Sequence, residues 1–235
     1  MREINKKNLQ YALVTLIFTI VTNQIVYQGA HYLSLALMRP WDITLPVDYT
    51  FPFVPWTLVI YLGSYAIWSV SYIVIALQDD RSQSELFFSA LLLSKLFCFA
   101  VFLLVPTTSG IRPEITGTSF FEKMAKVLYS VDFPVDPTNY FPSMHCLASW
   151  MCFIAVRGKK QFPLWWQALS FVLAIAVFVS TITTRQHVIL DVFGGIVFGE
   201  LSYAMAISYE IIPRTYTKIS SWIMGKLFAW KTIEG

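Results

Sequence analysis

The sequence has few charged residues and no segment that is rich in them. Only 13% of its 235 residues are charged, whereas 56% are hydrophobic and 17% are aromatic. Because a soluble globular domain carries about a quarter of charged residues, this composition excludes an ordinary soluble protein. Several apolar stretches approach the roughly 20 residues that cross a bilayer, and they account for most of the chain. We therefore expect a single integral membrane domain over residues 1–235.

The chain also lacks a metal-binding pattern, an internal repeat and a low-complexity tract. Its cysteines, Cys98, Cys146 and Cys152, do not have metal-ligand spacing, and two of them fall inside apolar runs, where cysteine packs as a small hydrophobe. We expect no metal and no other cofactor. The net charge of +3 is concentrated in short loops. Positive charge in short loops is typical of the loops that orient a membrane protein, and it does not favour a nucleic-acid partner.

Six apolar stretches predict an all-α, polytopic bundle of six transmembrane helices. The first stretch follows basic residues, as in a secretory signal, but it is long and no cleavage site follows it, so we expect an uncleaved helix. The predicted spans are residues 8–28, 53–77, 85–105, 143–156, 163–183 and 187–209.

Segments rich in lysine and arginine alternate along the chain with loops that are poor in them, and this alternation predicts the orientation of the bundle. The basic residues are concentrated in both terminal segments, around Arg81 and at residues 157–160. By the positive-inside rule we place these segments, including both termini, in the cytoplasm, and we expect a multi-pass protein of the cell membrane. The loops at 29–52, 106–142 and 184–186 then lie on the extracytoplasmic face.

The long loop at 106–142 contains an amphipathic segment. Five apolar residues recur in it at helical spacing, namely Phe120, Met124, Val127, Leu128 and Val131, while Glu122, Lys123 and Lys126 take the other face. We expect a helix lying in the membrane interface. It either forms a lid beside a lipid path or only covers the bundle.

Three polar clusters should meet at the extracytoplasmic level although they are far apart in the sequence. They are Arg112 with Pro113, residues 142–145, and the run from Arg185 to Asp191. Ionisable side chains at the edge of a membrane span are costly and are usually retained for function. We interpret residues 106–195 as the region that holds a catalytic site.

The residue types in these clusters suit phosphoryl transfer. His187 and Asp191 are four residues apart, so on a helix the carboxylate can accept a hydrogen bond from one ring nitrogen and leave the other free to attack. His187 is thus the candidate nucleophile. His145, on another helix, can protonate the departing alkoxide and then activate water.

Three further residues can hold the phosphate. Arg112 and Arg185 offer planar guanidinium donors, and Ser143 opens a helix whose N-terminal NH groups favour an anion.

The motifs resemble those of a known family. Pro142-Ser143-x-His145 followed by His187-x-x-x-Asp191 resembles the second and third signatures of the type 2 phosphatidic acid phosphatase (PAP2) superfamily, and Arg112-Pro113 resembles the end of the first. The resemblance covers about residues 95–200. It implies six spans, metal-independent chemistry, a His187 nucleophile with Asp191 as partner, a His145 acid, and phosphate binding by Arg112, Ser143 and an arginine before His187.

Two positions depart from the family pattern. Val105 stands where the first signature has a lysine, and Thr181 stands where the third has an arginine. Arg185 lies one helical turn beyond Thr181 and reaches the same pocket if the helix extends that far. A basic or polar residue close before the histidine is an arrangement that resembles the one in the branch that contains fungal inositol phosphorylceramide synthase.

Other features favour structural roles. Gly195 and Gly199 form a small-xxx-small pair that predicts close helix packing, and Arg39-Pro40 with Trp41 is typical of an interfacial anchor. Lys95 and Glu200 each lie near the middle of a span at matching depth, so we expect them to form an ion pair across the bundle.

The sequence therefore predicts a membrane lipid phosphatase that hydrolyses a lipid phosphomonoester or diphosphate through a phosphohistidine. Its partners would be the lipid phosphate substrate and membrane lipids. A phosphotransferase that moves a phospho-headgroup to an alcohol acceptor needs the same residues and stays an alternative. A lipid transporter or non-catalytic binder is a more distant one, because the sequence has no repeated halves with broken helices.

Overall fold

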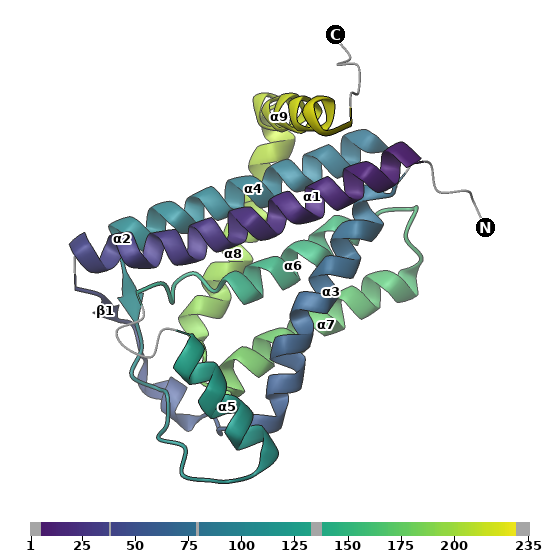
Figure 1. The fold of residues 1–235 in the computed structure, drawn as a ribbon. Helices are drawn as coiled ribbons and strands as arrows, with labels where there is room; N and C mark the ends of the chain where they lie inside the picture. Colours follow the sequence, from purple (N-terminus) through teal and green to yellow (C-terminus); the bar gives the residue numbers. More distant parts are fainter. Residues whose placement is uncertain (1–5, 38, 79, 133–137, 229–235) are drawn as a thin grey trace.

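The computed structural model describes residues 6–37, 39–78, 80–132 and 138–228. Within these ranges the chain is mostly helical with very little strand, which confirms the predicted all-α class (Figure 1). A π-helix, η1 (Ile25–Gly29), joins α1 (Lys6–Gln24) to α2 (Ala30–Leu37) in one long rod. The other helices are α3 (Leu58–Ala76), α4 (Arg81–Leu104), α5 (Phe120–Val131), α6 (Met144–Val156), α7 (Leu164–Thr183), α8 (Ile189–Ser208) and α9 (Ile211–Phe228).

Five of the described helical stretches are long and apolar enough to cross a membrane. They are Lys6–Ser34, Pro55–Ala76, Arg81–Leu104, Leu164–Thr183 and Ile189–Ser208. The protein is therefore a membrane protein. The remaining predicted span, α6, has 13 residues and is only about 20 Å long at 1.5 Å per residue, which is less than a bilayer's thickness.

The short helix α6 lies at the centre of the bundle, packed by α3, α4, α7 and α8. Ten of its 13 residues are buried. A helix that is surrounded on all sides has to be apolar all round, and the sequence of α6 has this property. Its first turn carries the Ser143 and His145 motif, so the surrounding helices decide what faces that motif.

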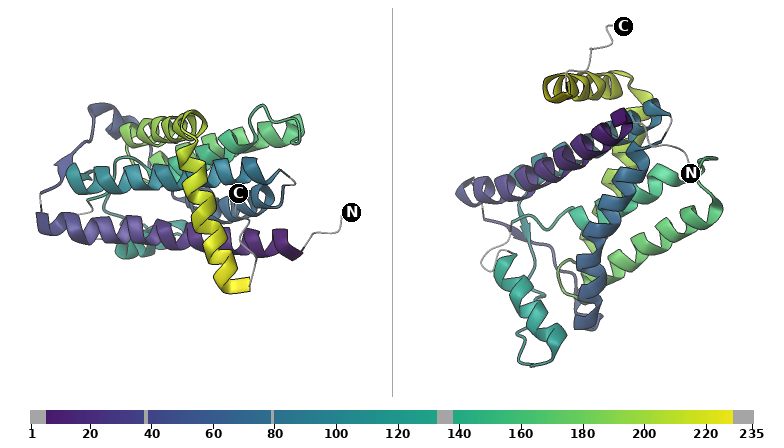
Figure 2. Two further views of the ribbon diagram at one scale, coloured as in Figure 1. Left: turned by 90° about the horizontal axis from the view of Figure 1, so that it is seen from above. Right: turned by 45° about the vertical axis from the view of Figure 1, so that its right-hand side comes forward.

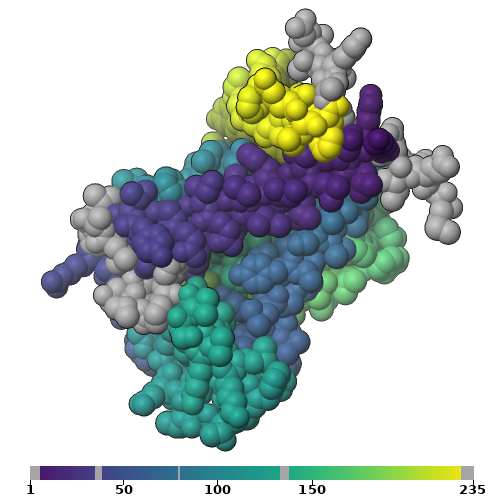
Figure 3. Space-filling model, viewed as in Figure 1, coloured from purple at the N-terminus to yellow at the C-terminus, as the bar shows by residue number. Residues whose placement is uncertain are grey.

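The two ends of the bundle differ in what they hold. At one end, Gln161 Nε2 donates to Gln83 Oε1 at 3.2 Å and Thr217 Oγ1 donates to Glu85 Oε2 at 2.8 Å, which brings the predicted cytoplasmic loops together. At the other end lie α5 and a two-stranded parallel ladder of β1 (Trp41–Asp42) and β2 (Thr107–Thr108). The predicted helix in the 106–142 loop is confirmed as α5, which contacts α3 and appears beside it in Figure 3.

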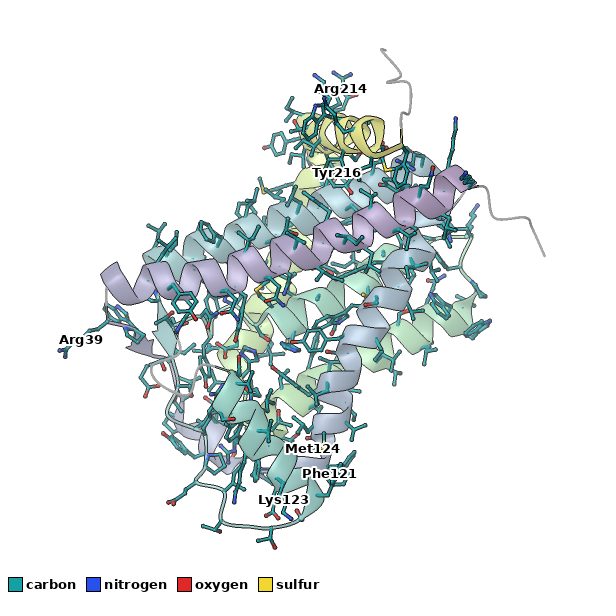
Figure 4. All side chains as sticks on the ribbon, in the orientation of Figure 1. Arg39, Phe121, Lys123, Met124, Arg214 and Tyr216 are labelled. Carbon is teal, nitrogen blue, oxygen red and sulfur yellow. The ribbon has the colours of Figure 1, made fainter. Side chains whose placement is uncertain are left out.

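The C-terminal segment forms a helix that the sequence analysis did not predict. Beyond α8, α9 crosses the ends of α4 and α1 (Figure 2). Tyr216 lies on the side facing the bundle and is buried, whereas Arg214 lies on the outer side (Figure 4). Arg214 of this tail thus stands on the outer face of the helix.

The expected ion pair between Lys95 and Glu200 is wrong. Glu200 accepts from both Arg157 nitrogens, Nη1 at 2.6 Å and Nη2 at 2.9 Å, and from Trp150 Nε1 at 2.9 Å. Lys95 donates instead to the Thr19 carbonyl oxygen at 2.7 Å. Matching depth along two helices does not place two side chains on facing sides, and Arg157 at the end of α6 reaches Glu200 from a neighbouring helix.

The predicted close packing at the glycine pair holds for one of its two members. A Cβ at Gly195 would stand 2.8 Å from both the Ser143 oxygen and the Leu147 nitrogen, which are backbone atoms of the first turn of α6. At Gly199 the nearest atom would be 3.5 Å away, which is an ordinary contact. Only Gly195 is therefore required for α8 to approach α6 at the level of the motif.

We predict that Gly195→Ala lowers the stability of the protein and that Gly199→Ala does not. Overpacking a tight site costs about 1–3 kcal/mol, here because α8 must move away from α6. Thermal unfolding in detergent should show a lower midpoint for Gly195→Ala and a midpoint close to that of the parent for Gly199→Ala. Equal midpoints for the two variants would contradict this assignment.

Candidate active site

A short backbone ladder holds the segment that leads into α6. The Thr107 nitrogen donates to the Thr138 oxygen at 3.0 Å, the Tyr140 nitrogen donates to the Thr107 oxygen at 3.3 Å, and the Phe141 nitrogen donates to Thr107 Oγ1 at 2.8 Å. Ser34 Oγ from the first helix donates to Thr138 Oγ1 at 2.6 Å. The loop before the Ser143 and His145 motif is therefore fixed to the strand β2 and to the end of the first helix.

Ser143 joins the first turn of α6 to the first turn of α8. Its hydroxyl caps α6 by accepting from the Cys146 nitrogen at 3.3 Å, as the sequence predicts for a helix start. Its own backbone nitrogen donates to the Asp191 oxygen at 3.1 Å. Ser143 is fully buried. The two helices that carry the candidate catalytic histidines are thus connected directly at their N-terminal ends.

The turn between α7 and α8 reverses the chain immediately before His187. The Gln186 nitrogen donates to the Thr181 oxygen at 3.0 Å and the Arg185 nitrogen donates to the Ile182 oxygen at 3.0 Å, the pair of bonds that closes a Schellman motif. Arg185 occupies the left-handed position, with φ of 56°, where glycine is usual. α7 ends at Thr183, as the predicted span 163–183 does, so the helix does not extend to Arg185 and the condition for Arg185 to reach the pocket by one helical turn is not met.

His187 and Asp191 form the pair that their spacing predicts. His187 Nδ1 lies 3.1 Å from Asp191 Oδ2, and the Val188 nitrogen donates to the same carboxylate oxygen at 3.0 Å. Asp191 is fully buried. A carboxylate held by a backbone NH and facing Nδ1 fixes the orientation of the ring, so that Nε2 can carry the lone pair.

His145 faces His187 from the first turn of α6, with their ring centroids 6.3 Å apart. Three rings of α3 surround His145. Tyr61 stacks on it at 4.1 Å, and Trp68 and Tyr65 lie at 5.1 Å and 5.3 Å. The structure therefore brings the rings of the two histidines to within the distance of an aromatic contact.

Arg112 connects the first predicted cluster to the third. Its Nη2 donates to Gln186 Oε1 at 2.8 Å and to Asp132 Oδ2 at 2.9 Å, and its Nη1 donates to the Asp132 carbonyl oxygen at 2.9 Å. Although burial lowers the pKa of the Arg112 guanidinium, its neighbours, with Tyr140 and Asp132 first among them, together raise this pKa above the usual value, so Arg112 keeps its charge. All three clusters thus meet, through Gln186, beside His187.

Several buried polar atoms around His187 lack a hydrogen-bond partner within the described residues. Donor groups among them are Gln186 Nε2 and the Tyr140 hydroxyl, and His145 Nε2 is a third when it carries the ring proton. The Tyr140 ring lies 5.7 Å from the His187 ring. Burial raises the pKa of Tyr140 to about 12, so its hydroxyl stays protonated at neutral pH. Because buried donors are nearly always satisfied, this group of atoms indicates a site for an acceptor such as a phosphate.

Arg185 has a different environment from Arg112. Its Nη1 donates to the Asp48 carbonyl oxygen at 2.8 Å, and its Nη2 donates to the Phe51 carbonyl oxygen. Asp48 belongs to the 3₁₀ helix η2 (Pro46–Thr50), and Phe51 is the residue that follows it. These bonds anchor the turn before His187, and direct phosphate binding by Arg185 or Ser143 stays a prediction.

Sequence reasoning missed several residues of this site. Asp132, Tyr140 and Gln186 each contact Arg112 or His187, and the buried Asp48 accepts from the Leu45 nitrogen at 2.8 Å and the Ile189 nitrogen at 2.9 Å. Gln186 belongs to the third predicted cluster, in which it was given no role, and Tyr140 lies within three residues of predicted positions and could have been found by proximity. Asp48 and Asp132 belong to loops, and the spacing of residues in the sequence does not predict which groups a loop residue contacts.

The fold and the site define a class of protein: an all-α membrane protein in which a His–Asp pair at the start of one helix faces a histidine at the start of its neighbour. A family model described as the PAP2 superfamily matches residues 41–205. The chain belongs to the PAP2 superfamily, and this makes it a lipid enzyme of the phosphatase or phosphotransferase type. The narrower resemblance to inositol phosphorylceramide synthase stays a prediction. A comparison with curated proteins found no match.

We predict that Asp48→Ala destabilises the protein although Asp48 is far from the other residues of the candidate site in sequence. The substitution removes the acceptor of two backbone NH groups, one at the start of α8, and a buried donor left unpaired costs about 1–3 kcal/mol. Thermal unfolding in detergent measures the change. Asp42→Ala is the control, because its carboxylate accepts from the exposed Thr44 nitrogen. An equally small shift in both variants would contradict the role of Asp48.

Proposed function

We propose that the protein is a metal-independent lipid phosphatase that hydrolyses a lipid phosphomonoester or diphosphate through a phosphohistidine. One observation carries the proposal: His187, oriented by Asp191, faces His145 across 6.3 Å between ring centroids, with the charged Arg112 joined to the neighbouring Gln186. The arrangement supplies a nucleophile, an acid and a cation to one phosphate. His187, Asp191 and His145 are the proposed catalytic residues.

In the first step the phosphoryl group moves to His187. Asp191 accepts the Nδ1–H, so the Nε2 lone pair attacks phosphorus while the bond from phosphorus to the lipid oxygen breaks. Protonated His145 gives its proton to the departing alkoxide, which leaves as the lipid alcohol. The imidazolium-like charge that develops on His187 is stabilised by the Asp191 carboxylate.

In the second step a water molecule takes the place of the lipid alcohol. Neutral His145 removes a proton from this water as its oxygen bonds to phosphorus, and the bond from phosphorus to Nε2 breaks. The products are inorganic phosphate, free His187 and protonated His145. The same residue thus acts as acid and then as base, as microscopic reversibility requires.

The charge of the phosphate would be held by Arg112, with the unpartnered Gln186 amide and the Tyr140 hydroxyl as further donors. In the structure the Asp132 carboxylate binds Arg112. A phosphate in the site would therefore compete with Asp132 for the guanidinium. We assign supporting roles in phosphate binding to Ser143, through the N-terminal end of α6, and to Arg185, through the turn that it anchors.

The proposed setting is the cell membrane, with both termini cytoplasmic and the site at the extracytoplasmic face, as the distribution of basic residues indicates. The end of α5 lines a pocket beside His145 through Leu128, Val131 and Asp132. This contact supports α5 as a lid over the lipid path. It equally suits a phosphotransferase in which an alcohol, instead of water, accepts the phosphoryl group from His187.

We predict that purified protein releases phosphate from a panel of lipid phosphates in the presence of EDTA and that His187→Asn abolishes the release. Loss of the nucleophile should lower kcat by at least about 10³-fold, because no other step can replace the covalent intermediate. The panel contains phosphatidate, phosphatidylglycerol phosphate, an isoprenyl diphosphate and a sphingoid phosphate.

An unchanged thermal midpoint of His187→Asn serves as the folding control in this assay. Phosphate release that survives the substitution would contradict the phosphohistidine, and release that stops in EDTA would contradict metal independence. Formation of a new phosphorylated product only when an alcohol is added would favour the phosphotransferase.

A further inference from the structure

A pocket of about 180 Å³ opens beside His145 and has two unlike walls. One wall consists of the aromatic side chains Tyr61, Tyr65 and Trp68, which recur at helical spacing on α3. The other consists of the amide side chains Asn23, Gln24 and Gln28 of the first helix. The proposed mechanism uses His145 but none of the three amides.

The three amides lie within a membrane-spanning helix, Lys6–Ser34. Within the described part of the chain, none of their side chains makes a hydrogen bond to another protein group. An amide that faces hydrocarbon without a partner costs several kcal/mol, on the order of 4–8 on a cyclohexane scale. Amides at this depth are therefore explained best by a polar ligand or water in the pocket that they line.

The backbone of the first helix changes at this place. Residues Ile25–Gly29 form a π-helix, and such insertions occur frequently at functional sites. Near this change the Tyr27 carbonyl oxygen accepts from Asn139 Nδ2 at 3.2 Å, and the Tyr27 hydroxyl donates to Asp132 Oδ1 at 2.7 Å. The π-helix therefore ties this stretch of the first helix to the segments that enclose the site.

The chemistry of the pocket favours hydroxyl groups over a cation. Aromatic rings with a carboxylate nearby can bind an ammonium group. Here the Tyr61 face is stacked on His145, and the Asp132 carboxylate is bound by Arg112 and Tyr27. Amide groups, which both donate and accept hydrogen bonds, suit the hydroxyls of an alcohol.

We propose that this pocket binds a hydroxyl-bearing alcohol portion of the substrate, of the glycerol or polyol type, with Gln24 and Gln28 as specificity residues. The inference rests on the proposed function, because His145 protonates the oxygen of the alcohol that leaves and this alcohol must lie beside it. The pocket then selects lipid phosphates that carry hydroxyl groups close to the phosphate over those in which a plain hydrocarbon chain follows it.

The test compares two substrates that have chains of similar length and differ next to the phosphate: a monoacylglycerol phosphate with a free hydroxyl, and hexadecyl phosphate. The ratio of their kcat/KM values is measured for the parent, for Gln24→Leu/Gln28→Leu and for Gln161→Leu. Gln161 is the matched control, because its amide lies in an exposed loop at the other end of the bundle. A ratio taken within one sample does not depend on the fraction of folded protein.

We expect the parent to prefer the monoacylglycerol phosphate and the double variant to lose about tenfold of this preference, as the removal of a hydrogen bond predicts. Gln161→Leu should keep the parent ratio. The pocket assignment is wrong if the double variant keeps the parent ratio or if the parent prefers hexadecyl phosphate. In either case the proposed function stands as long as phosphate release depends on His187. Release that does not depend on His187 would instead overturn the proposed function.

Discussion

Asp191 is the residue on which the geometry of the site depends. Its carboxylate accepts from the Val188 nitrogen and lies against His187 Nδ1, while its carbonyl oxygen accepts from the Ser143 nitrogen. One residue therefore sets the orientation of His187 and fixes the first turn of α6 beside it. Because Gly195, one turn further along α8, leaves no Cβ against that turn, the two helices can approach closely enough for these bonds.

This contact also explains why the central helix is short. α6 begins at the site, so its first turn, which carries His145, lies among the surrounding helices. The ladder around Thr107 and the bond from Ser34 to Thr138 hold the segment that enters it. The loops at this end of the bundle thus hold the polar start of α6 beside His187.

The sequence was sufficient to predict the elements that local pattern controls. Apolar length predicted the membrane spans, amphipathic spacing predicted α5, and the i, i+4 spacing predicted the contact between His187 and Asp191. The signature motifs also predicted the family that the comparison confirms. These features depend on residues close together in the chain or on motifs with fixed spacing.

The features that the sequence did not predict depend on rotation about helix axes and on loop conformation. The predicted pair of Lys95 and Glu200 rested only on their equal depth along two spans. Lys95 donates instead to the Thr19 carbonyl oxygen, and Glu200 accepts from Arg157. The environment of Arg185 could not be predicted, because this non-glycine residue adopts the left-handed conformation after the end of α7 and two loop carbonyls bind its side chain. The bond between Arg112 and Asp132 joins two positions of one irregular loop, for which no periodicity exists.

The central claim is that His187 becomes phosphorylated, and acid–base stability of a trapped intermediate tests it most directly. Protein would be mixed with a lipid phosphate labelled in its phosphate, quenched within one turnover, and analysed for protein-bound label. The account predicts label that is stable in alkali and lost in acid, absent in His187→Asn, and accumulating in His145→Ala when the substrate has a good leaving group. Label that remains on the His187→Asn protein, or phosphate release without any labelled protein in His145→Ala, would contradict the account.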